Sequence, residues 1–319
     1  MAVLVGIDEA GFGPILGPLV VSSTAFSVPD EILDADLWRI LGKSVGKQRK
    51  HLAGRLLVAD SKKAYNRSVG IGHLERTVLA AIKYLGAEPA NLGELILLLC
   101  PDCLSRLGRY PWHGDMDDYP LPVGSADTRI ASAVFADDMH ACRMKLLSLS
   151  SCCLDVAYYN KMVSSMKNKA NVLFMAASQL IQKVLDCSDE QQVRIVVDRQ
   201  GGRLRYREGL QRSFSDMQLR ILQEDPHDSS YELCGNGKIM RVSFVVDADD
   251  HFLPVSLASM VSKYLRELLM DGLNRYFVQM HPALKPTAGY WRDGLRFIKD
   301  LRQNVPHVQI DDGLLIRCR

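Results

Sequence analysis

The chain has 319 residues, of which 47% are hydrophobic and 24% charged, a composition typical of a globular protein with a large core. Its 39 lysines and arginines nearly balance its 37 acids, so the net charge of +2 excludes a strongly basic or acidic chain, although basic residues can still cluster on one face. The N-terminus lacks a signal-peptide pattern, and the apolar stretch 14–26 is broken by proline and glycine, so we expect a cytoplasmic protein without a membrane segment.

Hydrophobic patterning predicts strands and helices that alternate from the start of the chain. The apolar runs 2–8 and 19–26 are predicted strands, with a glycine- and proline-rich turn between them. A helix followed by a basic stretch is expected within 32–56, a helix over 73–85, and a strand over the apolar run 94–100.

The rest of the chain is less uniform. Residues 101–150 contain several prolines and an acidic patch, and we expect them to be rich in loops. The β-branched run 193–198 is a predicted strand, and the sequence CGNGK at 234–238 predicts a hairpin between two further strands. The expected helices of this part lie at 160–185, 203–223, 257–276 and 291–301.

Three of the predicted strands end in acidic residues. Asp8 and Glu9 end the first strand, Asp198 ends the run 193–198, and the group 247–250 follows the strand after the hairpin. Interleaved strands and helices predict an α/β fold with a sheet flanked by helices, and ligands of such sheets collect at the carboxyl ends of the strands. The acids are therefore expected to converge at one edge of the sheet.

Converging carboxylates favour a metal site. Two unit charges about 4 Å apart repel by roughly 4 kcal/mol at an effective dielectric near 20, so several carboxylates need a cation among them. Oxygen ligands without histidine or cysteine favour Mg²⁺ or Mn²⁺, and two such ions can promote phosphodiester cleavage. Taken singly, an aspartate at the end of a strand is more often a helix cap or turn residue, which is how we interpret Asp247 and Asp250.

The eight cysteines do not predict a disulfide framework, because the chain lacks a secretion signal. Cys100 and Cys103 form a single CxxC pair without the second pair or the histidines that a structural zinc site usually needs. Ordinary buried thiols are the expectation there.

Four segments in the chain resemble, in order, the motifs of the type 2 ribonuclease H family. They are GIDEAGFGPILGPLVV (6–21), ADSKKAY (59–65), VVDRQGG (196–202) and ADDHFLPVSLASMVSKYLRE (248–267). The resemblance implies a ribonuclease H-like fold, a mixed central β-sheet flanked by helices with extra helical and loop elements. It places the catalytic domain at 1–280, with a divergent insertion at about 101–150, and a C-terminal helical extension at 281–319 packed on the core.

By position, the resemblance makes Asp8, Glu9, Asp198 and Asp249 the catalytic and metal-binding acids. It implies a two-metal Mg²⁺ or Mn²⁺ site and cleavage of the RNA strand of RNA–DNA hybrids, leaving 5′-phosphate and 3′-hydroxyl ends. We expect the protein to be a monomer.

The resemblance also implies substrate-binding residues, each with a plainer alternative. They are the turn Gly11, Phe12 and Gly13, together with Lys62, Lys63, Asn168, Ser259, Lys263 and Tyr290. The lysines at 62 and 63 could instead be solvated surface residues, Asn168 a helix start, Ser259 a helix-packing residue, and Tyr290 and Trp291 buried aromatics. The basic stretch 43–55 and the arginines between 199 and 212 could line a duplex-binding face.

Phe12 separates this chain from the bacterial RNase HII branch, which has arginine between the two glycines. The segment 159–175 is closer to the RNase HIII pattern, so the chain is expected to be a divergent member between the two branches. Two other functions remain open: a nuclease acting on another structured nucleic acid, and a non-catalytic nucleic-acid-binding protein on the same fold.

Overall fold

The computed structural model describes residues 1–65, 68, 70–122, 125–305 and 310–318. Its strands are β1 (Ala2–Ala10), β2 (Leu19–Val28), β3 (Val45–Gly46), β4 (Leu56–Leu57), β5 (Lys145–Leu154), β6 (Gln192–Asp198), β7 (Gln218–Glu224), β8 (Asp228–Gly235) and β9 (Lys238–Val245). Its helices are α1 (Leu37–Ile40), α2 (Ser61–Ala64), α3 (Gly72–Tyr84), α4 (Leu92–Leu99), α5 (Leu104–Leu107), α6 (Ala126–Ala141), α7 (Val156–Met166), α8 (Lys169–Cys187), α9 (Arg207–Ser213), α10 (Ala248–His251), α11 (Leu253–Met280), α12 (Trp291–Asn304) and α13 (Asp312–Leu315). Single 3₁₀ turns lie at Asp30–Ile32, Pro101–Cys103 and Pro111–His113.

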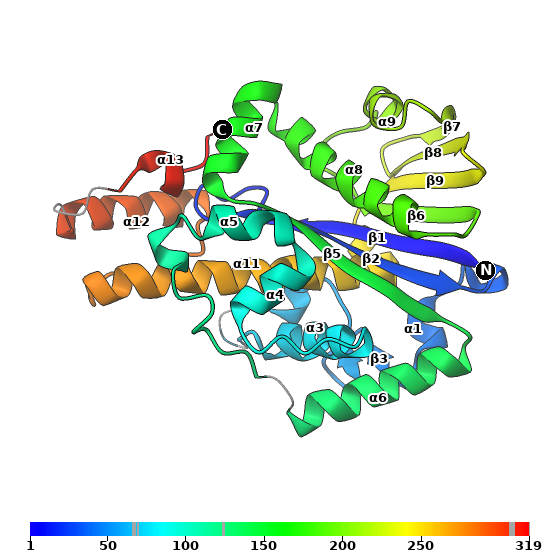
Figure 1. Ribbon diagram of the computed structural model, residues 1–319, viewed down its shortest axis with the longest axis horizontal. Coiled ribbons are helices and arrows are strands. Elements are labelled where there is room, and N and C mark those ends of the chain that lie inside the picture. The colour runs from blue at the N-terminus through cyan, green and yellow to red at the C-terminus, as the bar shows by residue number, and fades with distance from the viewer. Residues whose placement is uncertain (66–67, 69, 123–124, 306–309, 319) are drawn as a thin grey trace.

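A seven-stranded sheet forms the centre of the molecule, in the order β5-β2-β1-β6-β9-β8-β7. β1 runs parallel to β6, and β6 runs parallel to β9, whereas β2 and β5 on one side and β8 and β7 on the other are antiparallel to their neighbours. The sheet is therefore mixed, and helices cover both of its faces (Figure 1). The predicted fold class is confirmed.

The two faces of β1 are packed against different helices. Val3, Val5 and Ile7 belong to the apolar cluster that contains α7 and α8, whereas Leu4 belongs to the cluster that contains α3, α4, α6 and the first part of α11. Gly6 lets α11 approach β1 closely, because a Cβ at this position would lie 2.1 Å from the carbonyl carbon of Pro254. This close approach brings the start of α11 beneath the acidic end of β1.

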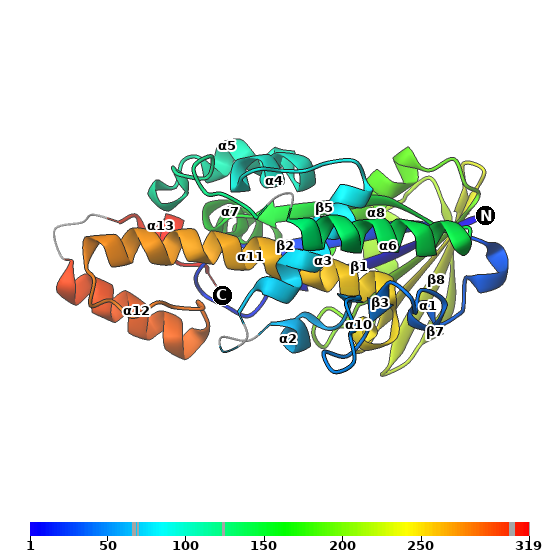
Figure 2. The same cartoon turned by 90° about the horizontal axis from the view of Figure 1, so that it is seen from below.

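The C-terminal segments pack along the far half of α11. α12 lies beside that half, as Figure 2 shows, and its buried Phe297, Ile298 and Leu301 share an apolar cluster with Phe277 of α11 and Ile15 of the β1–β2 loop. The division of the chain into 1–280 and 281–319 stays a prediction. None of the helices in the described ranges is long and apolar enough to cross a lipid bilayer.

The strand predicted over 94–100 is wrong, because this segment is helix α4. Asn91 accepts a hydrogen bond from the Glu94 amide at 2.8 Å as the N-cap, and Glu94 accepts one from the amide of the preceding Ala90 at 2.7 Å, so both side chains stabilise the start of the helix. The buried residues recur at helical spacing, at Leu92, Leu95, Ile96 and Leu99. The apolar composition suggested a strand, but cap and spacing determine a helix.

The loop-rich expectation for 101–150 is also wrong in its second half. Ser125 caps the long helix α6, and the segment ends in β5, which pairs with β2. Buried serines obscured this strand in the sequence: Ser151 of β5 and Ser22 of β2 are hydrogen-bonded at 2.8 Å inside the protein. A polar pair of this kind is stable in a core because each hydroxyl satisfies the other.

Three helix predictions require correction in their extents. The helix expected within 32–56 is only the single turn α1. The helix predicted over 160–185 is two helices, since Lys167 adopts a left-handed conformation with φ 53° and Asn168 starts α8. The helix predicted over 203–223 is the short α9 followed by the exposed edge strand β7.

Candidate active site

The four acids that the sequence singled out line one cavity of about 280 Å³. Asp8 and Glu9 come from β1, Asp198 from the end of the adjacent parallel strand β6, and Asp249 from α10, which follows β9. The other residues that line this cavity, which we call the acidic cavity, are Ala10, Gly11, Phe12, Gly13, Pro14, Asp60, Ser61, Lys62, Asp247, Ser259, Lys263 and Tyr290. The parallel order of β1, β6 and β9 brings these acids together.

Hydrogen bonds hold the acids in place. Asp8 is 6% exposed, and its carboxylate accepts hydrogen bonds from the Glu9 amide at 2.6 Å and from Ser259 of α11. The Asp198 carboxylate accepts a hydrogen bond from the Ala248 amide at 2.8 Å. The acid on β6 thereby fixes the start of α10, the helix that contains Asp249.

Burial and mutual repulsion disfavour the charged forms of these acids. Burial, with the charges of Glu9 and Asp198, raises the pKa of Asp8 well above its ordinary value. Burial and the charge of Asp198 raise the pKa of Glu9 to about 8, and burial raises the pKa of Asp198 to about 6. Burial and the neighbouring Asp60 raise the pKa of Asp249 to about 7. A cation bound among these four acids would stabilise their charged forms and so lower their pKa values.

The chemistry of these ligands fits a hard divalent cation, because all four offer carboxylate oxygens. As the side chains stand, however, no three of the described histidine, cysteine, aspartate and glutamate residues form a group that could hold a metal ion. The acids therefore line one cavity, but their side chains are farther apart than the ligands of a bound metal ion would be.

Two acids of the cavity were missed as site residues. Asp60 accepts a hydrogen bond from the Lys62 amide at 2.9 Å as the cap of α2, and it also hydrogen-bonds to Asp249. Asp247 occupies the left-handed turn before α10, with φ 51°, and its side chain lines the cavity instead of capping the helix. The motif ADSKK could have indicated Asp60, but helix capping explains that residue as well in a sequence.

The two lysines of that motif differ in their surroundings. Lys62 lines the acidic cavity; burial lowers its pKa, but the charges of Asp60, Asp249 and Asp8 outweigh this and raise it. Lys63 forms an ion pair with Asp250 and is not among the cavity residues. Asp250 lies in the single-turn helix α10, where its amide donates to the Asp247 carbonyl at 3.0 Å, so it occupies a turn as expected and its side chain adds the ion pair with Lys63.

The residues expected on α11 face the cavity, whereas Asn168 does not. Ser259 lies 3.1 Å from the Ser61 hydroxyl, and the Lys263 ammonium lies 2.6 Å from Glu267 and over the ring of Tyr65. Asn168 accepts a hydrogen bond from the Ala170 amide at 2.8 Å, which makes it the helix start that the sequence left open. Its place at α8 lies outside the residues that line the acidic cavity.

The turn Gly11–Gly13 lies over two buried arginines. Gly11 has φ 92°, and a Cβ there would lie 2.4 Å from Nε of Arg266, so only glycine fits. Arg317, near the C-terminus, donates hydrogen bonds to the carbonyl oxygens of Gly11, at 2.6 Å, and Pro14. The side chain of Phe12 packs towards α8, where Lys169 lies 5.2 Å from its ring. The C-terminal segment thus supports the turn from beneath.

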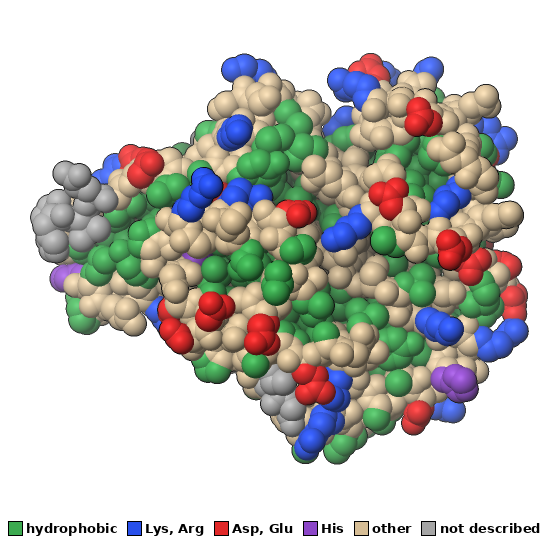
Figure 3. All heavy atoms as spheres, viewed as in Figure 1, with side chains coloured by type: hydrophobic (Ala, Val, Ile, Leu, Met, Phe, Trp, Pro, Cys, Tyr) green, Lys and Arg blue, Asp and Glu red, His purple; other side chains and the backbone are tan. Residues whose placement is uncertain are grey.

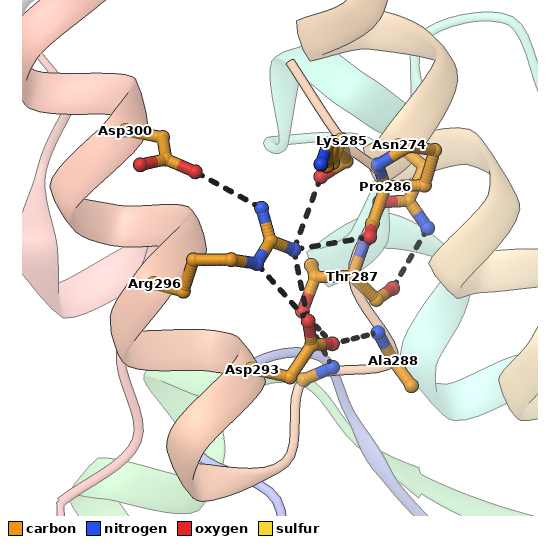
Figure 4. Close-up of polar contacts among 9 residues, drawn as sticks. Asn274, Lys285, Pro286, Thr287, Ala288, Asp293, Arg296 and Asp300 are labelled. Atoms are coloured by element: carbon orange, nitrogen blue, oxygen red, sulfur yellow. Dashed lines mark hydrogen bonds and ion pairs between the residues drawn. The ribbon is translucent and has the colours of Figure 1, made fainter.

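Tyr290 is 52% exposed at the cavity, so the alternative of a buried aromatic is wrong for this residue and for Trp291, which is 43% exposed. The segment before Tyr290 is fixed by polar contacts between α11 and α12 (Figure 4). Asp293 accepts hydrogen bonds from Thr287 and Ala288, and the amide of Thr287 donates to Asn274 of α11. These contacts hold the Gly289 carbonyl where it accepts from the Ile15 amide at 2.8 Å.

The basic residues expected on a duplex-binding face are partly engaged within the protein. Arg199 donates to the Asp225 carbonyl at 3.0 Å, and the Arg203 guanidinium lies 4.9 Å from the ring of Phe174. On the face shown in Figure 3, basic and acidic side chains are interspersed, and neither sign forms a continuous band. That face offers no extended basic track for a nucleic-acid backbone.

No family model matches the chain. One segment of 109 residues is 35% identical to ribonuclease HII of Gluconobacter oxydans; it covers 34% of this chain and 46% of the relative, so the chain spans about half the length of the curated relative that it matches. This match confirms the resemblance to type 2 ribonucleases H and, with its short extent, the divergence.

Solved structures of similar proteins include RNase HII of Archaeoglobus fulgidus, described in a complex with PCNA, and ribonuclease H2 of Pyrococcus horikoshii. The first is 14% identical with a TM-score of 0.47, covering 99% of this chain and 94% of that one; the second is 13% identical with a TM-score of 0.47, covering 98% and 92%. A Bst-RNase HIII structure with Mn²⁺ is 16% identical with a TM-score of 0.43, covering 93% of this chain and 62% of that one.

Proposed function

We propose that the protein is a ribonuclease H that cleaves the RNA strand of RNA–DNA hybrids with the help of Mg²⁺ or Mn²⁺. The observation that supports this most directly is the acidic cavity, in which Asp8, Glu9, Asp198 and Asp249 meet beside an exposed lysine and a glycine turn. The similarity of a segment to ribonuclease HII adds support from an independent source.

Asp8, Glu9, Asp198 and Asp249 would hold the metal ions. Such ions activate the attacking water and stabilise the leaving oxygen of a phosphodiester. The raised pKa values of the acids support this assignment, because a cation among them would restore their charged forms. Asp60 and Asp247 are acids of the same cavity and would add to its negative field.

The remaining cavity residues have roles in positioning. Lys62 presents a positive charge where a substrate phosphate would approach the acids, and Ser259 holds the Asp8 carboxylate. The turn Gly11–Gly13 and Tyr290 form the rim on which a nucleotide could lie. Lys63 is a weaker candidate for phosphate contact because Asp250 already neutralises it.

A cleavage assay with four substrates tests this function: an RNA–DNA hybrid, a duplex with one ribonucleotide, plain duplex DNA and a branched DNA, each with and without Mg²⁺ or Mn²⁺. We expect cleavage of the hybrid only with metal, giving 5′-phosphate and 3′-hydroxyl ends. Asp8→Asn should abolish it, whereas Asp186→Asn, an exposed acid on α8, should not. Intact hybrid after prolonged incubation with Mn²⁺ would refute the proposal.

A second candidate is a nuclease for another structured nucleic acid. Phe12 supports it, since the phenyl side chain packs towards α8 and cannot donate a hydrogen bond to a ribose. Cleavage of the branched DNA but not of the hybrid would favour this function. Binding without cleavage of any substrate would favour a non-catalytic protein. A hybrid as partner, a monomeric state and a cytoplasmic location stay predictions.

A further inference from the structure

Three cysteine thiols meet on the side of the sheet that faces α4 and α5. Cys100 follows α4, Cys103 lies in the 3₁₀ turn before α5, and Cys153 lies on β5. The sulfurs of Cys100 and Cys103 are 3.4 Å apart, and the Cys153 thiol hydrogen-bonds to Cys103. All three residues are buried. We call this group the thiol trio; the proposed nuclease chemistry uses none of its members.

A cation and a cavity adjoin the thiol trio. Arg106 donates hydrogen bonds to the Cys153 carbonyl at 2.9 Å and to the Asp155 carboxylate at 2.7 Å. A cavity of about 290 Å³ is lined by the thiol trio together with Cys152, Arg106 and Lys183. The trio is therefore not sealed inside solid packing: a small polar molecule has room beside the sulfurs, in a space that Asp102 also lines.

The three thiols are not equivalent. Hydrogen bonding with Cys100 and Cys153, aided by the charge of Arg106, lowers the pKa of Cys103, whose sulfur also lies 3.0 Å from the Cys100 carbonyl oxygen. The same hydrogen bonds to Cys103, together with burial, raise the pKa of Cys100 and Cys153. Because the thiolate is the reactive form of cysteine, the lowered pKa favours Cys103 as the nucleophile, with Cys100 in contact with it at 3.4 Å.

We propose that Cys103 is an oxidation site that forms a reversible disulfide with Cys100 when the protein meets a hydroperoxide. Cys100 is the partner because the Cys103 amide donates to the Cys100 carbonyl at 3.1 Å, which closes a turn. The Cα atoms of such a turn lie within about 7 Å, close to the range that a disulfide spans.

The reaction balances with hydrogen peroxide as the oxidant. The Cys103 thiolate attacks one peroxide oxygen, the O–O bond breaks, and hydroxide leaves, which gives a sulfenic acid at Cys103. The Cys100 sulfur then attacks the sulfur of the sulfenic acid, and the S–O bond breaks. The hydroxyl group leaves with the Cys100 proton as water. Two thiol hydrogens are lost in total, and an added dithiol reverses the oxidation.

The experiment uses the full chain with the three exposed cysteines replaced: Cys187→Ser, Cys234→Ser and Cys318→Ser. The protein is treated with a small excess of hydrogen peroxide, denatured, alkylated and analysed by intact mass and by peptide mapping. We expect the loss of two hydrogens, a peptide that links Cys100 to Cys103, and recovery of both thiols after dithiothreitol. The same peroxide dose is also applied to the unfolded chain as a control. If that dose oxidises the cysteines of the unfolded chain but leaves all three thiols of the trio free to be alkylated after treatment of the folded protein, the proposal is overturned.

Two variants separate the roles of the thiols. Cys103→Ser should abolish the loss of two hydrogens, whereas Cys100→Ser should leave a sulfenic acid at Cys103 that reacts with dimedone. Cys142→Ser, a half-buried thiol away from the trio, is the matched control and should leave the disulfide unchanged. Melting curves identify any variant that does not fold. If one does not fold, the peptide map of the protein with only the three exposed cysteines replaced still shows whether Cys100 and Cys103 become linked. A linkage of Cys103 to Cys153 would overturn the assigned partner.

Discussion

The turn Gly11–Gly13 lies between two groups of charged side chains of opposite sign. The two groups differ in how far other groups of the protein balance their charges. Above the turn, the acidic cavity gathers carboxylates whose pKa values are raised by burial and by one another. Beneath it, Arg266 and Arg317 are buried guanidiniums. In the described part of the chain no carboxylate lies within ion-pair distance of Arg317, and Arg266 has only Glu267, at 3.9 Å.

Backbone carbonyl groups accept hydrogen bonds from both arginines. Arg317 donates to Gly11 and Pro14, and Arg266 donates to Leu16 at 3.2 Å and Ala288 at 3.1 Å. The acids have Lys62 and a few amides, which leave most of their charge unbalanced. Beneath the turn the carbonyl oxygens have the arginines as donors, although Nε of both arginines and Nη1 of Arg317 lack a hydrogen-bond partner among the described residues. Above the turn, a cation would balance the charge of the acids. Removing a charge should therefore have opposite effects on the two sides.

The largest effect is expected beneath the turn. Arg317→Met leaves the carbonyls of Gly11 and Pro14 without a donor in a buried place. Each of the two unsatisfied groups costs about 1 to 3 kcal/mol, so the free energy of unfolding should fall by roughly 2 to 6 kcal/mol. Urea denaturation measures the loss, and Arg317→Lys, which keeps a charged donor, should retain part of the stability. An unchanged denaturation midpoint in Arg317→Met would contradict this account of the turn.

In the acidic cavity, removing a charge is expected to increase the stability of the protein. The pKa of Asp198 is raised to about 6 in the folded protein, so the stability linked to this group is lost as the pH rises through that value. Asp198→Asn removes the penalty and should stabilise the metal-free protein at pH 8 by about 1 to 3 kcal/mol, with little effect at pH 4. Thermal melts in the presence of a chelator measure the difference. Destabilisation at pH 8 would mean that the acids do not repel one another in the free protein.

Burial of a charged group is avoided in a third way at His113, because a histidine can lose its charge. His113 packs against Tyr110 and Trp112, and burial lowers its pKa to about 3. The unfolded chain takes up a proton near pH 6.5 that the folded protein refuses, so His113 should cost about 2 kcal/mol of stability at pH 5 relative to pH 8. The pH dependence of unfolding in His113→Phe should be flatter by that amount. A parallel dependence in both proteins would show that His113 is protonated when folded.

The smallest effect is expected at Asn168, away from both sides. As the cap of α8 it should contribute about 1 kcal/mol, which Asn168→Ala removes and Asn168→Asp retains. The free energy of unfolding of the three proteins tests the cap. If Asn168→Asp binds the hybrid more weakly at unchanged stability, that result would support the substrate contact of Asn168 that the family resemblance implies.

Periodicity and cap residues were sufficient for the elements whose signals agree. The strands of Asp8 and Asp198, the hairpin at 234–238 and the helix that contains Ser259 were all predicted from the sequence. Predictions failed where composition and cap disagreed, as at α4, and where buried serines replaced apolar residues, as at β5. The resemblance indicated the four acids, but capping obscured Asp60, because an aspartate before a helix has an ordinary local explanation.

The sequence by itself determined that acids end three of the strands and that glycines form the turn after the first, since local periodicity and residue type specify such features. Only the tertiary structure decided that Arg317, more than 300 positions from Gly11, supports that turn, and that Cys153 of β5 joins the pair Cys100 and Cys103. Contacts of this kind leave no trace in local patterning. They arise when segments distant in the chain pack together, and their energies come from hydrogen bonds that form only once the fold has brought those segments into contact.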